Sequence, residues 1–160
     1  MAVRNAAEVG EPVDAITDAL LTASRLLVAI SARSIALVDE RITIPQFRTL
    51  VILSNRGPVN LATLAGLLDV QPSMTGRMVD RLVSTGLIDR HPHPNSRREL
   101  VAELTVHGRK VVQQVTAHRR SEIARIVEKT PTRERSGLVR ALTAFTTAAG
   151  EPAAPLDVEF

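Results

Sequence analysis

Two short helical segments with a brief break between them constrain the fold of this chain more than any other sequence feature. Asn60 can cap one helix that runs through Leu68, and Pro72 can start a second helix that stops at Gly86. Helices joined this closely must cross and share a core. We expect that core to contain Leu64, Ala65, Leu68, Val70, Met78 and Leu82. The alternative is an ordinary helical hairpin.

A β-hairpin is predicted directly after these two helices. The sequence period changes after Gly86, and residues 87–90 and 99–104 are predicted to form short strands. Residues 91–98 between them are rich in Pro and turn formers, which predicts a loop. Two closely joined helices followed by such a hairpin indicate a winged helix-turn-helix. The expected fold class is therefore mainly α with a small β-hairpin wing.

The polar face of the second helix indicates double-stranded DNA as a partner. Its first turns carry six residues that we assign to base contact: Gln71, Ser73, Met74, Gly76, Arg77 and Arg81. Arg can bind a guanine edge, Gln an adenine edge, and a Met methyl can touch a thymine methyl. Two alternatives stay open: Gly76 could be a tolerated substitution rather than a site of close DNA approach, and Arg77 could pair with Asp80.

The predicted hairpin adds a second basic surface. Residues 90–98 contain three Arg and two His but no acid. Such a tip can enter the minor groove, where the DNA potential is most negative. The residues assigned to this contact are Arg90, His91, His93, Ser96, Arg97 and Arg98. A solvated turn is the alternative.

Charge and composition narrow the function further. Residues 71–150 carry 14 Lys or Arg and 7 acids, a net charge of +7, whereas residues 1–70 are close to neutral. The chain has no Cys, which excludes thiol chemistry and thiol sensing, and only three Phe as aromatic residues, which argues against single-strand stacking. It contains no catalytic motif, so we expect no enzyme activity. The longest apolar run, residues 26–30, predicts no membrane span, and the first ten residues contain no apolar signal core, so we expect a cytoplasmic protein. The expected DNA partner would make it nucleoid-associated.

Long helices are predicted on both sides of the winged region. Apolar spacing predicts one helix over residues 13–38, and its apolar rows cover about half of the circumference, enough for a partner chain as well. A capping box of Thr43 and Gln46 starts the next helix. Thr105 caps a helix to about Lys129, and one last helix is predicted from residue 130 to Gly150. Residues 1–11 and the acidic, Pro-containing residues 150–160 are expected to be tails.

Residues 43–108 resemble the MarR family of bacterial transcription regulators. The densest match is residues 79–90, which contain an Asp-Arg-Leu and a Gly-Leu. Residues 43–50, 64–65, 96–98 and the Leu-Thr-x-x-Gly of residues 104–108 also match. The outer helices match in length and position, so the resemblance extends over residues 13–149.

The resemblance implies a homodimer in which each winged region, residues 43–105, reads half of a near-palindromic operator. The dimerisation helices would be residues 12–40 and 106–149, with contacts from Val13, Ile16, Leu20, Leu27, Leu138, Leu142 and Phe145. Two positions depart from the family pattern. Ser96 stands where an Asp usually braces the wing, a role that Asn95 or Glu99 could take, and Gly76 replaces the usual Ser or Thr.

The resemblance also implies a repressor that a small anionic ligand can release from DNA. Few aromatic walls exist for such a pocket, because Phe47 and Phe145 are expected in the core. No cofactor and no metal are expected, since His107 and His118 lie about 16 Å apart along one helix. Protonation of the four His could instead make DNA binding pH-dependent. The competing function is a winged helix that binds proteins without specific DNA binding.

Overall fold

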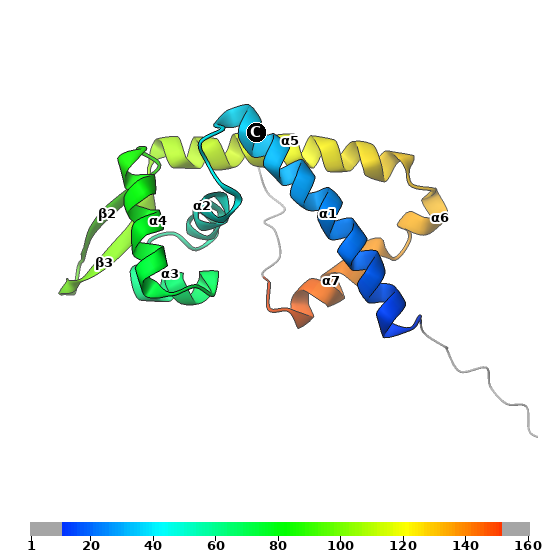
Figure 1. The fold of residues 1–160 in the computed structure, drawn as a ribbon, viewed down its shortest axis with the longest axis horizontal. Helices are drawn as coiled ribbons and strands as arrows, with labels where there is room; N and C mark the ends of the chain where they lie inside the picture. Colours follow the sequence, from blue (N-terminus) through cyan, green and yellow to red (C-terminus); the bar gives the residue numbers. More distant parts are fainter. Residues whose placement is uncertain (1–10, 152–160) are drawn as a thin grey trace, which may run out of the picture.

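The structure, a computed structural model, describes residues 11–151. A winged unit, formed by the elements from α2 to β3, lies at one end of the long helix α5, and α1, α6 and α7 form a helical arm at the other end (Figure 1). The elements are α1 Val13–Val38, α2 Ile44–Arg56, β1 Val59–Asn60, α3 Leu61–Leu68, α4 Pro72–Ser84, β2 Ile88–His93, β3 Ser96–Leu104, α5 Val106–Lys129, α6 Thr132–Arg135 and α7 Leu138–Ala148.

Local capping explains where the helices of the winged unit begin. The Thr43 hydroxyl accepts a hydrogen bond from the Gln46 amide at 3.3 Å, and the Gln46 side chain accepts one from the Thr43 amide at 2.9 Å. Asn60 accepts the Thr63 amide at 2.7 Å and starts α3. These hydrogen bonds confirm the predicted starts of α2 and α3. The starts were predictable because the capping signals depend only on neighbouring residues.

The helix-turn-helix forms as expected. Leu64 and Leu82 are fully buried between α3 and α4, and Ala65 is buried beside them. The break between the helices contains Asp69 in the left-handed conformation, with φ of 54°. Three of the expected core residues are only partly buried: Leu68, Val70 and Met78. The two helices therefore share a core with α2, the sheet and the first half of α5.

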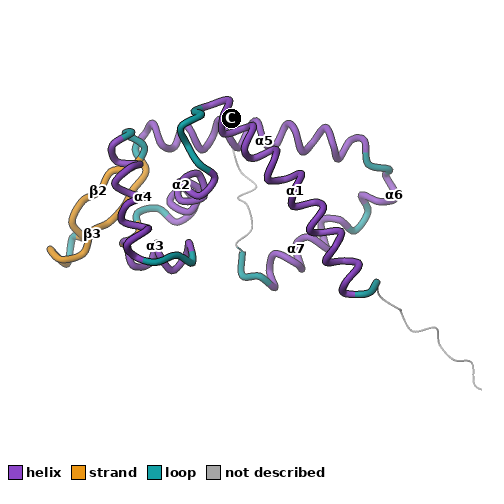
Figure 2. Tube along the Cα trace, viewed as in Figure 1, coloured by secondary structure: helices purple, strands orange, loops and turns teal. Residues whose placement is uncertain are grey.

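The wing is longer than the sequence predicts. Strands β2 and β3 pair antiparallel from Ile88–Leu104 outward to His93–Ser96, so most of the predicted loop 91–98 is strand (Figure 2). That prediction was wrong because the prolines lie in strand β2 and at the turn, and the hairpin continues through them. The sheet also contains β1, which pairs with Ala102 and Val101 of the central strand β3 and was not predicted.

A glycine divides the last predicted helix. The sequence predicts one helix from residue 130 to Gly150, but Gly137 adopts φ of 91° between α6 and α7. A left-handed residue cannot continue a right-handed helix, so the prediction of one helix was wrong. The expected tails lie outside the described residues, except for residue 11 and residues 150–151.

The helical arm leaves much of its apolar surface uncovered. In α1 only Ile30, Ser34 and Ile35 are buried, and α7 has no buried residue. Phe145 is 52% exposed, so its expected place in the core was wrong, whereas Phe47 is buried. By length and mean hydropathy α1 would also suffice to cross a membrane, contrary to the sequence-based prediction. Arg33 of this helix nevertheless pairs with Glu122 of α5 at 2.8 Å.

Candidate nucleic-acid interface

Helix α4 presents one polar face to solvent and one apolar face to the core. Thr75, Val79 and Leu82 face the core and are buried. The residues expected to contact bases lie on the rest of the surface: Gln71, Ser73, Met74, Arg77 and Arg81 are exposed, and Gly76 is partly buried. Pro72 occupies the first turn and has no amide N–H, and the Met74 amide donates to the Gln71 carbonyl at 3.0 Å, so the side chains of α4 rather than its first amides are available for contact. Polar and cationic groups thus share the face that a major groove could accept.

Asp80, the alternative partner predicted for Arg77, pairs with a different residue. Asp80 forms an ion pair with Arg90 of β2, which ties the base of the wing to α4. Within residues 11–151, neither Arg77 nor Arg81 takes part in an ion pair. Both guanidinium groups therefore remain available to phosphate or guanine. Sequence reasoning missed the Asp80–Arg90 contact because the two residues belong to different elements.

The wing is braced by histidines rather than by an Asp before the paired Arg residues. The His91 Nε2 lies 3.3 Å from the Glu103 carboxylate on the neighbouring strand, and its Nδ1 lies 3.2 Å from the Pro92 carbonyl. At the turn, the Asn95 amide donates to the His93 Nδ1 at 3.1 Å. Ser96 begins β3 and is partly buried. Among the described residues, neither the Asn95 nor the Glu99 side chain forms a hydrogen bond or an ion pair, so the expected bracing by these two residues is not found.

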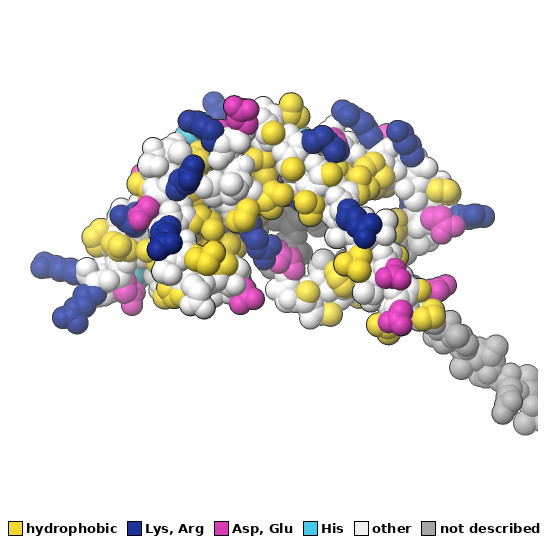
Figure 3. All heavy atoms as spheres, viewed as in Figure 1, with side chains coloured by type: hydrophobic (Ala, Val, Ile, Leu, Met, Phe, Trp, Pro, Cys, Tyr) yellow, Lys and Arg dark blue, Asp and Glu magenta, His cyan; other side chains and the backbone are white. Residues whose placement is uncertain are grey.

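The electrostatics of the wing favour positive charge. Hydrogen bonding to the Pro92 carbonyl and to the Glu103 carboxylate raises the pKa of His91 above its ordinary value. Arg97 and Arg98 are exposed near the turn, and Figure 3 shows Lys or Arg side chains projecting from the end of the hairpin. The tip therefore offers cations that no neighbouring element covers.

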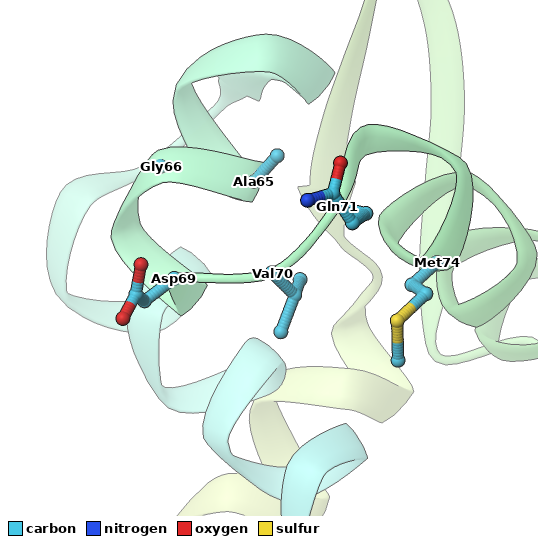
Figure 4. Close-up of a pocket in the computed structure, with 6 residues that line it drawn as sticks. All are labelled: Ala65, Gly66, Asp69, Val70, Gln71 and Met74. Carbon is cyan, nitrogen blue, oxygen red and sulfur yellow. The ribbon is translucent and has the colours of Figure 1, made fainter.

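A shallow hollow lies where α3 meets the start of α4. Its volume is about 360 Å³ and its lining residues, drawn in Figure 4, are Ala65, Gly66, Asp69, Val70, Gln71 and Met74. A smaller cavity of about 110 Å³ lies where the α1–α2 connection meets α4, with Asp39 and Arg41 in its wall. Neither lining contains an aromatic ring. Within the described part of the chain, no three His, Asp or Glu side chains cluster as a metal site.

Comparison with known sequences finds similarity to transcription regulators of the MarR family. The family model of the MarR family matches residues 42–100. The multiple antibiotic resistance protein MarR of Salmonella typhimurium is 34% identical over 73 residues, which are 46% of this chain and 51% of that protein. The chain thus spans about half the length of this curated relative.

Solved structures resemble the chain over a longer range. The crystal structure of RV1404 from Mycobacterium tuberculosis is 77% identical, covers 91% of this chain and 99% of its own, and superposes with a TM-score of 0.83. A cysteine-to-serine variant of MarR from Escherichia coli, crystallised with operator DNA, is 22% identical and covers 81% of this chain and 92% of its own. Its TM-score of 0.65 shows a shared fold.

Proposed function

This chain belongs to the MarR family of winged helix-turn-helix transcription regulators, which are not enzymes, and from that premise we propose that it is a homodimeric repressor of a near-palindromic operator. The observation that carries the proposal is the pair of uncompensated guanidinium groups, Arg77 and Arg81, on the exposed face of α4. Helix α4 would enter the major groove, with Gln71, Ser73 and Met74 near the base edges.

The wing would contact DNA beside the major-groove site. Arg97 and Arg98 follow Ser96 at the beginning of β3, next to the turn, so their side chains are suited to an adjacent minor groove. His91 and His93 would add charge or phosphate contacts, and Arg90 would act mainly by holding the wing to Asp80. The wing would thus supply affinity with little sequence dependence, whereas α4 supplies specificity.

The exposed apolar residues of the arm support a homodimer. Six of the seven residues assigned to dimerisation are at least 40% exposed in the single chain, and Leu20 is partly buried. Apolar surface of this extent on two helices is typical of a protein contact. A second copy that covers α1 and α7 would hold two winged units in one dimer, so that each could bind one half of the operator.

We further propose that DNA binding can be regulated by a small ligand or by pH. The 110 Å³ cavity adjoins Arg81 of α4, and Arg41 in its wall is paired with Asp39, so a small ligand bound there would act on α4 directly. Protonation of His91 would add positive charge to the wing. The repressor needs no cofactor in this scheme, and it would act in the cytoplasm on the nucleoid. The competing proposal, a winged helix that binds proteins only, leaves the free cations of α4 unexplained.

Binding to DNA from the region upstream of the protein's own gene tests the proposal. Wild-type protein is expected to give a sharp complex that survives excess competitor DNA. Arg77→Ala should cost about 1–3 kcal/mol of binding free energy and relax specificity at one base pair. Arg97→Ala should weaken binding to all sequences alike and lower the salt slope by about 1.

Arg125→Ala, an exposed substitution on α5 outside the winged unit, serves as the matched control and should bind DNA like wild type. Wild-type binding by both Arg77→Ala and Arg97→Ala would contradict the assigned contacts. No binding by the wild type at low salt would favour the protein-interaction module instead.

A further inference from the structure

Two buried polar side-chain atoms lack a hydrogen-bond partner in the described part of the chain. They are the Ser34 Oγ on α1 and the Arg119 Nε on α5. Ser34 is completely buried, and Arg119 is partly buried. Buried polar atoms in folded proteins nearly always have a partner, and a charged group without one is the more costly case. Neither atom is accessible to solvent, so a second chain could reach only the remaining, partly exposed atoms of the Arg119 side chain.

Both residues belong to the contact between α1 and α5. Ser34 follows Arg33, whose guanidinium pairs with Glu122 at 2.8 Å. Arg119 lies one turn before Glu122 and one turn after the fully buried Val115, so it shares their face of α5. The unpaired Nε is thus located on the side of α5 that meets α1.

Among residues 11–151, no anion compensates the charge of Arg119. Burial alone lowers the pKa of its guanidinium, with no contribution from a neighbouring carboxylate. Glu122, the nearest acid along this face, is already paired with Arg33. The charge of Arg119 is tolerated in the single chain because its remaining atoms still reach water.

In the homodimer, the charge of Arg119 would lose its contact with water. Exposed apolar residues continue from this region along both helices, with Leu26 and Leu27 on α1 and Ile126 and Val127 on α5. A second copy that covers them would also remove water from Arg119. Enclosing an unpaired charge costs several kcal/mol, so the covering surface must bring an anion.

We propose that the second copy of this chain supplies a carboxylate to Arg119, so that the interface contains two symmetric ion pairs. The proposal rests on the homodimer of the proposed function. The carboxylate is assigned to Asp14 or Asp18, which are the acids of α1 and lie at exposed positions four residues apart. They flank the exposed Ile16 on a part of α1 where no residue is buried by the described part of the chain. In a two-fold interface each pair forms twice.

The direction in which one substitution changes the dissociation constant of the dimer tests the proposal. Arg119→Met removes the charge and keeps most of the volume. If a carboxylate faces Arg119 across the interface, the substitution strands that carboxylate and raises the dissociation constant of the dimer by about tenfold or more. If no carboxylate is there, removal of an unpaired charge tightens the dimer or leaves it unchanged. Arg120→Met, the exposed neighbour, is the matched control.

A double-mutant cycle identifies the carboxylate. Asp14→Asn and Asp18→Asn are exposed substitutions that put folding at little risk, and each is measured alone and with Arg119→Met by sedimentation equilibrium. One of the two Asn variants should weaken the dimer by as much as Arg119→Met does. Combined with Arg119→Met, the same variant should weaken the dimer little further. Additive effects for both, or a tighter dimer in Arg119→Met, overturn the ion pair while wild-type dimerisation and operator binding remain intact. A monomeric wild type overturns the homodimer of the proposed function as well.

Discussion

At the scale of single residues, His91 is the best-defined titrating group of the wing. Both ring nitrogens face acceptors, the Pro92 carbonyl and the Glu103 carboxylate, so both are suited to donate. An imidazole that donates through both nitrogens is protonated. This geometry explains why the pKa of His91 is raised above 6.5.

The raised pKa predicts a stability change with a definite sign. The protonated ring stabilises the folded wing below pH 6.5, and that contribution is lost as the pH rises through the raised pKa. His91→Gln should therefore lower the thermal midpoint at about pH 5.5 and have little effect at about pH 9. Glu103→Gln should lower the pKa of His91, measured by NMR titration. Glu99→Gln on the same strand is the control, and an equal effect of both carboxamides would contradict the assigned contact.

Substitution of Gly76 distinguishes a glycine that the fold requires from a glycine that DNA binding requires. An added Cβ at this position would meet no atom within 4 Å, so nothing in the folded chain requires glycine. Gly76→Ala should raise the free energy of unfolding by about 1 kcal/mol through helix propensity alone. We expect the same substitution to weaken operator binding, because the methyl group would stand between the α4 backbone and the groove. Gly66→Ala, equally open, calibrates the stability gain by urea unfolding. Unchanged operator affinity in Gly76→Ala would mean that glycine is merely tolerated there.

At the scale of elements, Gly108 fixes how α5 leaves the wing. A Cβ on Gly108 would overlap the Leu87 carbonyl oxygen, and a backbone atom in a packed contact cannot move away without a large cost in free energy. The same region is tied by Thr105, whose hydroxyl donates to the Gly86 carbonyl at 2.7 Å and accepts the Gly108 amide at 2.9 Å. Helix α5 is thus held against the end of α4.

Gly108→Ala should destabilise the fold by more than about 2 kcal/mol, since the clash is with backbone in a close-packed contact. This is opposite in sign to Gly76→Ala, although both glycines lie within helices. Urea unfolding of the two variants side by side checks the contrast. A Gly108→Ala variant as stable as wild type would show that α5 can shift away from Leu87 without cost.

The elements that sequence reasoning predicted correctly are those with local causes. Capping by Thr43, Asn60 and Thr105 depends on residues three positions away, so the starts of α2, α3 and α5 follow from the sequence alone. The exposed face of α4 was predictable for the same reason, because apolar residues at helical spacing mark the opposite side.

The errors concern features that depend on distant contacts. Strand β1 has two residues and no periodicity, and it exists only because β3 pairs with it. The wing strands continue past Pro92 because ladder pairing across β3 outweighs the turn-forming composition. The Asp80–Arg90 and His91–Glu103 contacts join separate elements, so only the opposite charges could have suggested them. Gly137 is the exception, since a helix-breaking glycine was visible in the sequence.

At the scale of the whole molecule, the uncovered arm is the feature that needs a partner. A helix as long and apolar as α1 could suit a membrane or a protein surface. Charges distinguish the two: Arg25 and Arg33 interrupt the apolar sequence of the helix, and Arg33 is paired with Glu122 of the same chain. Helix α7 adds further exposed apolar residues, Leu138, Leu142 and Phe145, from a distant part of the sequence. Two separate helices with matching uncovered surface favour a second copy over a lipid phase.

Phe145→Asp should therefore dissociate the dimer without unfolding the winged unit. Phe145 is 52% exposed in the single chain, so a charge there costs little before association and much when a second copy encloses it. Because a monomer can hold only one half of the operator, the variant should also lose most of its operator affinity while keeping weak half-site binding. Sedimentation equilibrium and gel shift on full and half operators measure both effects. Val106→Asp is the matched control, since Val106 is 76% exposed at the start of α5 beside the winged unit. If Phe145→Asp stays dimeric and binds the full operator like Val106→Asp, then α7 lies outside the interface, and α1 and the end of α5 would have to join the two copies.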